Sequence, residues 1–400
     1  MFKIQTLNKI SSKGLDLFPH DLYEVASNIT EPDAILVRSA DLHTINIPDS
    51  VKAIARAGAG YNNIPISSCT GRGIVVFNTP GANANAVKEL TLTALFLASR
   101  DIFGGIKWVE SLAEKGTEVG DLVEKNKSQF EGPELQGKTL GVIGLGAIGV
   151  MVANDACALG MNVIGYDPYI SVDAAWNLSR HIVRADTLES LLTKSDYVTL
   201  HLPLIDTTKN FLDAEKFCFM KKKARLINFA RGALVNEADL IAALNNRTLS
   251  LYVTDFPSAD LITCPYALCI PHLGASTPEA EENCAVMAVQ QLREFLETGA
   301  IKNSVNYPQC RLEKSAPFRL LVANKDVPNM LGQITTILAK ASINITSLVN
   351  HSRNDYAYNI IDTEQHIATQ VLEQIKAVHG IIKVWVIEST SSKINDLQLG

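Results

Sequence analysis

The feature that most constrains this chain is a glycine-rich turn between an apolar strand and a helix. The run TLGVI at 139–143 leads into Gly144-Leu145-Gly146-Ala147-Ile148-Gly149. In this setting the first glycine permits a tight turn, the second lets the backbone approach a pyrophosphate, and the third lets helix and strand pack closely. Such a string alone is weak evidence, because an ordinary α/β protein can carry a glycine-rich turn.

An acidic residue at the end of the next strand strengthens that interpretation. Asp167 lies eighteen residues after Gly149, in VIGYDP. A carboxylate there can accept hydrogen bonds from both ribose hydroxyls, and it would repel a 2′-phosphate. Since strand, glycines, helix and acid occur in the required order, we predict an NAD-binding domain rather than a turn with Asp167 as a strand-end cap.

Composition limits the class of protein. A chain of 400 residues with 47% hydrophobic residues has material for two or three domains. The net charge is −6 and no long basic run occurs, so nucleic acid is not predicted as a partner. The seven cysteines lack metal-ligand spacing, which predicts no metal site and a cytoplasmic protein. No apolar stretch reaches about 18 residues, so we expect no membrane span and no export signal.

The alternation of strands and helices predicts the architecture. Apolar strands alternate with helical patterns in the first ninety residues and again from Thr139, which indicates two doubly wound parallel sheets of the Rossmann type. Residues 318–388 contain a βαββαβ pattern, typical of a ferredoxin-like domain. The predicted domains are a discontinuous substrate-binding domain (1–95 and 278–305), an NAD-binding domain (96–277), a linker (306–317) and a regulatory domain (318–390).

Three side chains near strand ends are candidates for the chemistry. Arg231 follows the strand LINFA and could grip a carboxylate with its planar fork. His272 follows ALCI and could act as acid and base, because histidine titrates near neutral pH. Asp260, in DFPSAD, could orient the histidine. Each also has a plain structural interpretation: a surface cation, a turn residue at a strand end, and a solvated loop acid.

Long strings of the sequence resemble the D-2-hydroxyacid dehydrogenase family over nearly the whole chain. They include NTPGANANAVKEL, GKTLGVIGLGAIG, LINFARGALVNEADL and PHLGASTPEAEENCA. The resemblance implies a catalytic arginine at Arg231, a histidine at His272 and a carboxylate at Asp260, where the family has glutamate. Asp260 is one methylene shorter than that glutamate, and sites of this kind are sensitive to a displacement of about 1 Å.

The resemblance also implies cofactor and substrate contacts. At Leu202 the chain departs from the family, which often has a threonine at this position. A backbone contact to the cofactor would survive that change, but a hydroxyl contact would not. The implied cofactor residues are Thr79, Gly144, Gly146, Ala147, Ile148, Gly149, Asp167, Leu202, Phe229, Ala230, Asp255, Gly274 and Ala275, with Asp255 on the nicotinamide carboxamide. The implied substrate residues are Arg38, Ser39, Arg56, Gly58, Gly60 and Asn83, and the alternative interpretation of Arg56 is a surface residue beside a glycine turn.

The activity implied is the NAD-dependent oxidation of 3-phospho-D-glycerate to 3-phosphohydroxypyruvate, the first step of serine biosynthesis. Two alternatives stay open: a dehydrogenase of glyoxylate, hydroxypyruvate or another 2-hydroxy acid, and a non-catalytic NAD-sensing protein of the corepressor type. Arg231, His272 and Asp260 argue against the last. A homodimer or homotetramer is expected, with a cleft that closes on the substrate.

The C-terminal pattern resembles an ACT domain, which implies oligomerisation or the sensing of an amino-acid effector such as serine. The positions that would meet the effector are Asn324, Asp326 and Asn344. Asn329 stands where the family's loop has glycine. Asparagine tolerates a left-handed backbone better than most residues, but its side chain occupies space that an effector might need.

Overall fold

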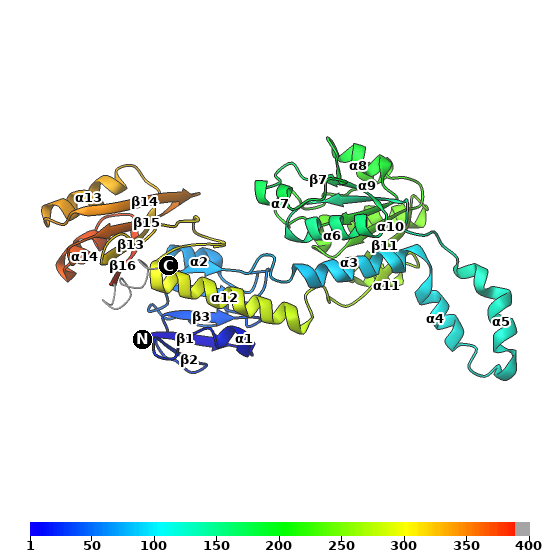
Figure 1. The fold of residues 1–400 in the computed structure, drawn as a ribbon, viewed down its shortest axis with the longest axis horizontal. Coiled ribbons are helices and arrows are strands. Elements are labelled where there is room, and N and C mark those ends of the chain that lie inside the picture. The colour runs from blue at the N-terminus through cyan, green and yellow to red at the C-terminus, as the bar shows by residue number, and fades with distance from the viewer. Residues whose placement is uncertain (389–400) are drawn as a thin grey trace. The chain divides into compact units, whose positions relative to one another are not determined.

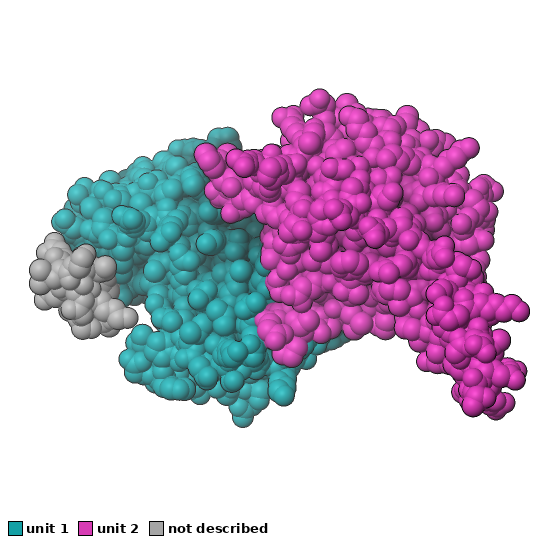
Figure 2. Space-filling view, turned by 45° about the vertical axis from the view of Figure 1, so that its right-hand side comes forward, with its two compact units in different colours: residues 1–82, 281–400 teal, residues 83–280 magenta. Residues whose placement is uncertain are grey.

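The computed structural model describes residues 1–388, which divide into two compact units (Figure 2). Unit 2 is Asn83–Ala280, and unit 1 combines Met1–Ala82 with the described residues from Glu281 onward. The residues 389 and 390, with which the predicted regulatory domain ends, lie outside the described part. None of the helices in residues 1–388 is long and apolar enough to cross a membrane.

Unit 2 is built on a seven-stranded parallel sheet in the order β12-β11-β10-β9-β6-β7-β8. The order reverses between β6 and β9, which is the switch point where doubly wound sheets bind ligands. Its strands are apolar because helices cover both faces of a parallel sheet. The strands are β6 (Thr139–Ile143), β7 (Asn162–Tyr166), β8 (Val183–Arg184), β9 (Tyr197–Leu200), β10 (Ala224–Asn228), β11 (Leu249–Thr254) and β12 (Ala267–Cys269).

The helices of unit 2 fall into two groups. Those around the sheet are α3 (Ala84–Ser99), α6 (Ala147–Ala158), α7 (Val172–Trp176), α8 (Leu188–Lys194), α9 (Ala214–Phe219), α10 (Glu237–Asn245) and α11 (Ala259–Thr263), with the 3-10 turn η3 (Gly232–Leu234). The others form an arm that projects from the unit (Figure 1): α4 (Ile102–Glu110), η1 (Gly116–Glu118), α5 (Val119–Asn126) and η2 (Lys127–Phe130).

Unit 1 contains a five-stranded parallel sheet in the order β2-β1-β3-β4-β5, again a doubly wound order. Its strands are β1 (Phe2–Leu7), β2 (Tyr23–Ala26), β3 (Ala34–Val37), β4 (Ala53–Arg56) and β5 (Val75–Phe77). The short helices are α1 (Ser12–Leu15) and α2 (Ile66–Gly71). The long α12 (Pro278–Thr298) packs its apolar side, including Val289, Leu292 and Phe295, into the core of this sheet.

The C-terminal part of unit 1 is a four-stranded antiparallel sheet in the order β14-β15-β13-β16. This βαββαβ order and the two parallel sheets confirm the predicted fold class. The elements are β13 (Phe318–Lys325), α13 (Met330–Lys340), β14 (Ile345–Arg353), β15 (Tyr356–Thr363), α14 (Thr369–Lys376) and β16 (Ile381–Glu388).

Both faces of the antiparallel sheet are buried, by different partners. Leu320 and Val322 of β13 pack with α13 and α14, whereas Leu321 and Ala323 join the core of α12 and the parallel sheet. Alternate residues of a strand point to opposite faces, so one apolar run serves two cores. The ring of Trp385 lies 5.8 Å from that of Phe295, centroid to centroid. The C-terminal sheet therefore shares a continuous apolar core with the N-terminal part of unit 1.

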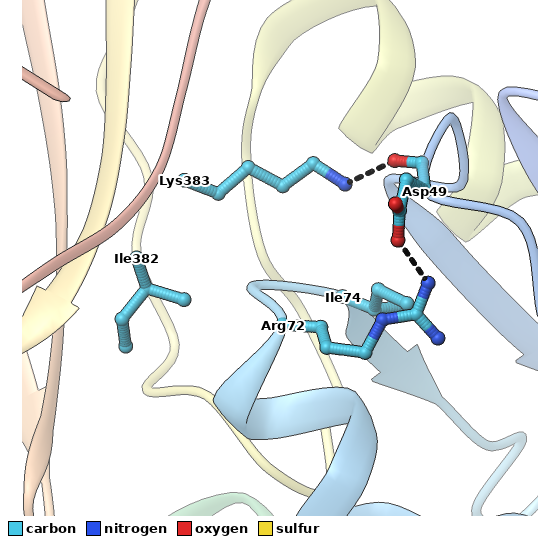
Figure 3. A pocket seen from close by; sticks show the side chains of 5 residues that line it. All are labelled: Asp49, Arg72, Ile74, Ile382 and Lys383. Atoms are coloured by element: carbon cyan, nitrogen blue, oxygen red, sulfur yellow. Dashed lines mark hydrogen bonds and ion pairs between the residues drawn. The ribbon is translucent and has the colours of Figure 1, made fainter.

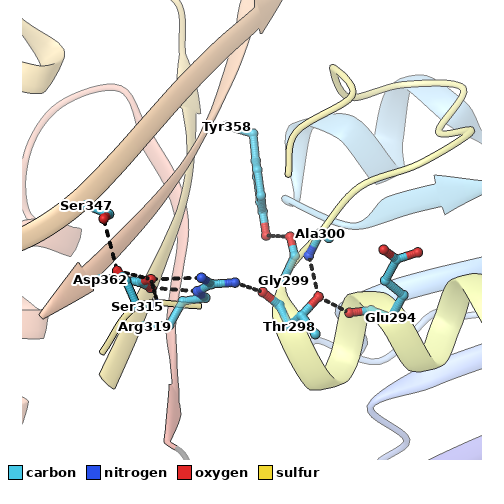
Figure 4. Close-up of polar contacts among 9 residues, drawn as sticks. All are labelled: Glu294, Thr298, Gly299, Ala300, Ser315, Arg319, Ser347, Tyr358 and Asp362. Atoms are coloured by element: carbon cyan, nitrogen blue, oxygen red, sulfur yellow. Dashed lines mark hydrogen bonds and ion pairs between the residues drawn. The ribbon is translucent and has the colours of Figure 1, made fainter. Parts of the chain in front are cut away.

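A buried ion pair reinforces the contact between the C-terminal sheet and the N-terminal part of unit 1, which we call the seam (Figure 4). Arg319 and Asp362 have no exposed side-chain surface, and the guanidinium donates to both carboxylate oxygens, at 2.6 and 2.8 Å. Arg319 also donates to the carbonyl of Thr298 at the end of α12, at 2.8 Å, while the hydroxyl of Tyr358 donates to the Gly299 carbonyl at 3.0 Å. Two C-terminal side chains thus satisfy carbonyls at the end of α12, where a helix has no intrahelical donors left.

Candidate active site

The glycine-rich turn requires glycine at two of its three positions. Gly144 has φ of +91°, and a Cβ there would lie 2.6 Å from the His201 carbonyl oxygen. A Cβ on Gly149 would overlap the carbonyl oxygen of Gly144. Gly146 is the N-cap of α6 and has open space where a Cβ would be. The start of α6 therefore presents free backbone amides to open space, which is how helices bind phosphate groups.

Asp167 is tied to this turn. One of its carboxylate oxygens accepts a hydrogen bond from the amide of Leu145, at 2.9 Å, and the other from the amide of Tyr169, at 2.9 Å. The side chain remains partly exposed. Each oxygen keeps a lone pair, so Asp167 can still accept bonds from hydroxyl groups of a ligand.

The buried carboxylate of Asp255 is the electrostatic centre of the candidate site. It is 1% exposed. Its Oδ2 accepts a hydrogen bond from the Gly274 amide at 3.2 Å, and its Oδ1 has no hydrogen-bond partner in the part of the chain that the structure describes. Burial raises the pKa of Asp255, while the Gly274 amide and the charges of His272 and Arg231 oppose that rise. Arg231 and His272 therefore lie within electrostatic reach of one carboxylate, and one oxygen of that carboxylate can accept a further hydrogen bond.

The two catalytic candidates are accessible and rest on ordered supports. Arg231 is exposed, and the buried Asn228 fixes its backbone by donating to its carbonyl at 2.9 Å. His272 is exposed too, and its ring packs against Phe256 with 4.8 Å between centroids. Both side chains can therefore meet a ligand without unpacking the core.

Asp260 is not brought to His272. It lies exposed in the first turn of α11, a helix capped by Ser258, and within the described residues its carboxylate makes no hydrogen bond or ion pair with the histidine. The carboxylate whose pKa responds to the charge of His272 is Asp255. A pairing of Asp260 with His272 would require the α11 segment to shift.

The other predicted cofactor residues differ in accessibility. Phe229 and Gly274 are buried, while Ala230, Ala275 and Leu202 are partly exposed. Thr79, in unit 1, is fully buried, and its hydroxyl has no hydrogen-bond partner among residues 1–388.

His201 is a residue of this region that the sequence prediction missed. Burial lowers the pKa of its imidazole to about 4, so it is neutral at physiological pH. Its Nε2 lies 3.1 Å from the Thr199 hydroxyl, and its backbone carbonyl lies directly beside Gly144 in the glycine-rich turn. Its place directly after β9 was the available signal, because ligands bind beyond the carboxyl ends of such strands.

In unit 1, most of the predicted substrate residues form one cluster. Arg56 donates to the carbonyls of Arg38 and Gly60, at 3.0 and 2.7 Å, and a Cβ on Gly58 would meet its guanidinium at 2.5 Å. Arg38 pairs with Glu281. The Ser39 amide donates to Asn8 at 3.0 Å. Asn83 belongs to unit 2, at the N-cap of α3.

The candidate effector residues also differ in setting. Asn324 is buried and accepts a hydrogen bond from Asn359 at 2.7 Å. Asp326 and Asn344 are exposed. Asn329 has φ of +66°, the left-handed conformation that asparagine adopts more readily than most residues.

Comparison with known proteins identifies the class. The family model described as "D-isomer specific 2-hydroxyacid dehydrogenase, NAD binding domain" matches residues 93–274. Residues 93–274 therefore match the NAD-binding domain of this family, which agrees with the predicted resemblance and with NAD as the predicted cofactor.

Over most of its length, the chain is similar to D-3-phosphoglycerate dehydrogenases. Those of Methanocaldococcus jannaschii and Bacillus subtilis are 35% and 33% identical to it over 82% and 80% of this chain, which spans only 61% and 62% of their lengths. The NAD⁺-bound 3-phosphoglycerate dehydrogenase of Entamoeba histolytica matches 76% of this chain and 98% of its own, with a TM-score of 0.58 and 26% identity. The D-mandelate dehydrogenase of Rhodotorula graminis, at 23% identity and a TM-score of 0.64 over 78% of this chain and 99% of its own, shares the fold.

Proposed function

We propose that this protein oxidises 3-phospho-D-glycerate to 3-phosphohydroxypyruvate with NAD, as the first step of serine biosynthesis. The observation that carries the proposal is the buried carboxylate of Asp255, which accepts a hydrogen bond from the Gly274 amide, keeps one oxygen without a partner among the described residues, and lies within electrostatic reach of Arg231 and His272. The similarity to D-3-phosphoglycerate dehydrogenases supports the choice of substrate. The cluster around Arg38 and Arg56 offers guanidinium groups and backbone amides of the kind that bind carboxylate and phosphate.

The residues present fit NAD. The amides at the start of α6 face open space, and the free Oδ1 of Asp255 can accept a hydrogen bond from a carboxamide NH₂. We assign the adenosine ribose to Asp167 and the nicotinamide end to Asp255, with Phe229 and Ala230 beside it. Bound NAD supplies the acceptor for the hydride.

The roles of the side chains follow from their chemistry. Arg231 holds the substrate carboxylate with two N–H donors and stabilises charge on the 2-oxygen. His272 removes the proton from the 2-hydroxyl, and the negative field of nearby carboxylates stabilises the imidazolium that forms. Asp255 supplies part of that field, and Asp260 adds to it if α11 moves toward the histidine.

A substrate panel tests the proposal. Initial rates at 340 nm are measured for 2-hydroxy and 2-keto acids with NAD(H) and with NADP(H). We expect the highest kcat/KM for 3-phosphoglycerate and its keto acid with NAD(H). Equal activity without the phosphate would indicate a glyoxylate or hydroxypyruvate dehydrogenase instead. NAD binding without hydride transfer to any acid of the panel would indicate a sensing protein.

Asp255→Asn should weaken NAD binding and yet not destabilise the unliganded protein. Losing a hydrogen bond to a charged acceptor costs about 1.5–3 kcal/mol, or roughly 10- to 100-fold in affinity. Because the pKa of Asp255 is raised in the folded state, its contribution to stability is present below the unfolded pKa and lost as the pH rises through the folded pKa. Calorimetry should therefore show reduced NAD affinity, and melting at pH 7 should show equal or greater stability.

Asp206→Asn, at an exposed position of the same unit, is the matched control and should change neither property. Unaltered NAD affinity of the Asp255→Asn variant would remove Asp255 from the cofactor site.

We propose that the arm of unit 2 pairs with a second copy of the chain. Along α4, the side chains of Ile102, Phe103, Ile106 and Val109 are 39–52% exposed. Apolar side chains at this spacing form one stripe, and stripes of this kind mark protein interfaces. Light scattering should give a dimer or tetramer, and Ile106→Lys should lower the molar mass. Val172→Lys, at an apolar residue exposed elsewhere on the unit, should leave the molar mass unchanged.

We propose that the C-terminal βαββαβ region is an ACT domain that senses an amino acid, with Asn324, Asp326 and Asn344 as contacts. Serine is the first effector to test, because it is the end product of the proposed pathway. Initial rates with millimolar serine, together with calorimetry, provide the measurement. Unchanged rates and no binding heat would exclude serine.

A further inference from the structure

A pocket lies between the C-terminal sheet and the parallel sheet of unit 1, away from every residue assigned above (Figure 3). It has a volume of about 270 Å³ and is lined by Asp49, Arg72, Ile74, Ile382 and Lys383. Two cations thus face a space that has isoleucine side chains in its walls. Low-dielectric surroundings strengthen the attraction between such cations and an anion.

Lys383 brings a positive charge into this pocket without a carboxylate to balance it. Its stem crosses Gly73, where a Cβ would overlap it, and its ammonium donates to the carbonyls of Val51 and Asp49, at 2.5 and 3.3 Å. Within residues 1–388, no carboxylate lies within ion-pair distance of its Nζ. Burial, together with the nearby charges of Lys52 and Arg72, lowers the pKa of Lys383 to about 8, although Asp49 opposes this shift.

The other charged groups around the pocket do not neutralise the positive charge of Lys383. Lys52 is neutralised by Asp33 at 2.8 Å. Arg72 donates to the carbonyl of Ile47 at 2.8 Å and to the carboxylate of Asp49 at 2.7 Å. The Asp49 side chain is fully exposed, so its pairing with Arg72 contributes little and can be exchanged for another anion. Arg72 thus already holds a carboxylate at the rim, while Lys383 has none.

We propose that this pocket binds a small oxyanion, of the carboxylate or phosphate class, between the guanidinium of Arg72 and the ammonium of Lys383. The anion displaces the exposed carboxylate of Asp49 and supplies the counter-charge that Lys383 lacks. Because β16 contributes Lys383 and the segment after α2 contributes Arg72, a bound anion links the C-terminal sheet to the parallel sheet. Anion binding also favours the protonated form of Lys383, so the protein should take up protons when the anion binds near pH 8.

The test uses sulfate as the probe, because sulfate does not titrate near neutral pH. Calorimetry on the full chain at pH 8, in two buffers of different ionisation enthalpy, measures affinity and proton uptake together. We expect sulfate binding with proton uptake in the unaltered protein. Lys383→Met should abolish the proton uptake and weaken binding about tenfold, and Arg72→Gln should weaken binding by a similar factor. Sulfate bound at the active-site arginines would give heat that Lys383→Met leaves unaltered.

Two further variants keep the test decisive. Asp49→Asn removes the competing carboxylate from an exposed position, so it should fold normally and bind sulfate more tightly than the unaltered protein. Lys340→Met is the matched control, an exposed lysine of the same sheet-and-helix region, and should behave as the unaltered protein. Sulfate binding of equal strength in folded Lys383→Met, or no gain in affinity in Asp49→Asn, would overturn the proposal.

Discussion

Replacing His272 with alanine should lower kcat by roughly 10²- to 10⁴-fold, the usual contribution of a general acid and base. The affinity for NAD should change by no more than about twofold, because the imidazole is assigned to the substrate proton and not to the cofactor. Stability should hold as well, since the ring is exposed and its aromatic contact is with Phe256. Single-turnover rates with 3-phosphoglycerate and calorimetry with NAD give the two quantities.

The control for this variant is His181→Ala, at an exposed histidine of the same unit. It should retain full activity. If His272→Ala lost NAD affinity and turnover by equal factors, the histidine would be a cofactor contact, and the proposed mechanism would fail.

Replacing Arg319 with methionine should destabilise unit 1 by about 3–5 kcal/mol, because it leaves the buried Asp362 carboxylate without its partner. The variant also frees the Thr298 carbonyl at the end of α12. Replacing both partners, with Arg319→Met and Asp362→Leu together, should recover much of the loss, since an apolar pair needs no counter-charge. Denaturant unfolding measures all three proteins.

The pH dependence provides a second reading of the same pair. Burial alone would raise the pKa of Asp362, but the hydrogen bonds from Arg319 and Ser315 outweigh it and hold the pKa below its ordinary value. The folded pKa is depressed, so the stabilisation is present above the unfolded pKa of about 4 and is lost as the pH falls through the folded value. The control for Arg319→Met is Lys376→Met, which breaks the exposed pair with Glu373 and should change the stability by about 0.5 kcal/mol or less. If Arg319→Met lost no more stability than this control, the buried pair would not hold the seam.

The sequence predicted the strands of the fold well, for a physical reason. A strand covered on both faces must be apolar throughout, so Ala34–Val37 and Thr139–Ile143 stand out between glycines and polar residues. The part of the arm that follows α4 was missed, because the segment from Glu110 to Gln136 is polar and its helices are short. The shared core was missed too. The apolar sequence of β13 does not indicate which helices or which sheet will pack against each of its faces.

The candidate site was predictable where residue type and strand position coincide, as for Arg231 and His272. Distances between side chains of separate loops depend on packing that no spacing encodes. For that reason the sequence suggested Asp260 as the partner of His272, whereas the structure leaves Asp260 exposed and places Asp255 within electrostatic reach. The unsatisfied oxygen of Asp255 and the neutral state of His201 likewise arise only from burial in the fold.

The four-stranded sheet is buried on both sides, and this limits how the gene can be cut. Deleting the segment from Phe318 onward would uncover Phe295 and Tyr307 and leave the last carbonyls of α12 without donors. Such a fragment would expose an aggregation-prone apolar surface, so we expect it to be insoluble when it is expressed. Point substitutions at the seam are therefore better suited than truncation to testing what the C-terminal sheet does.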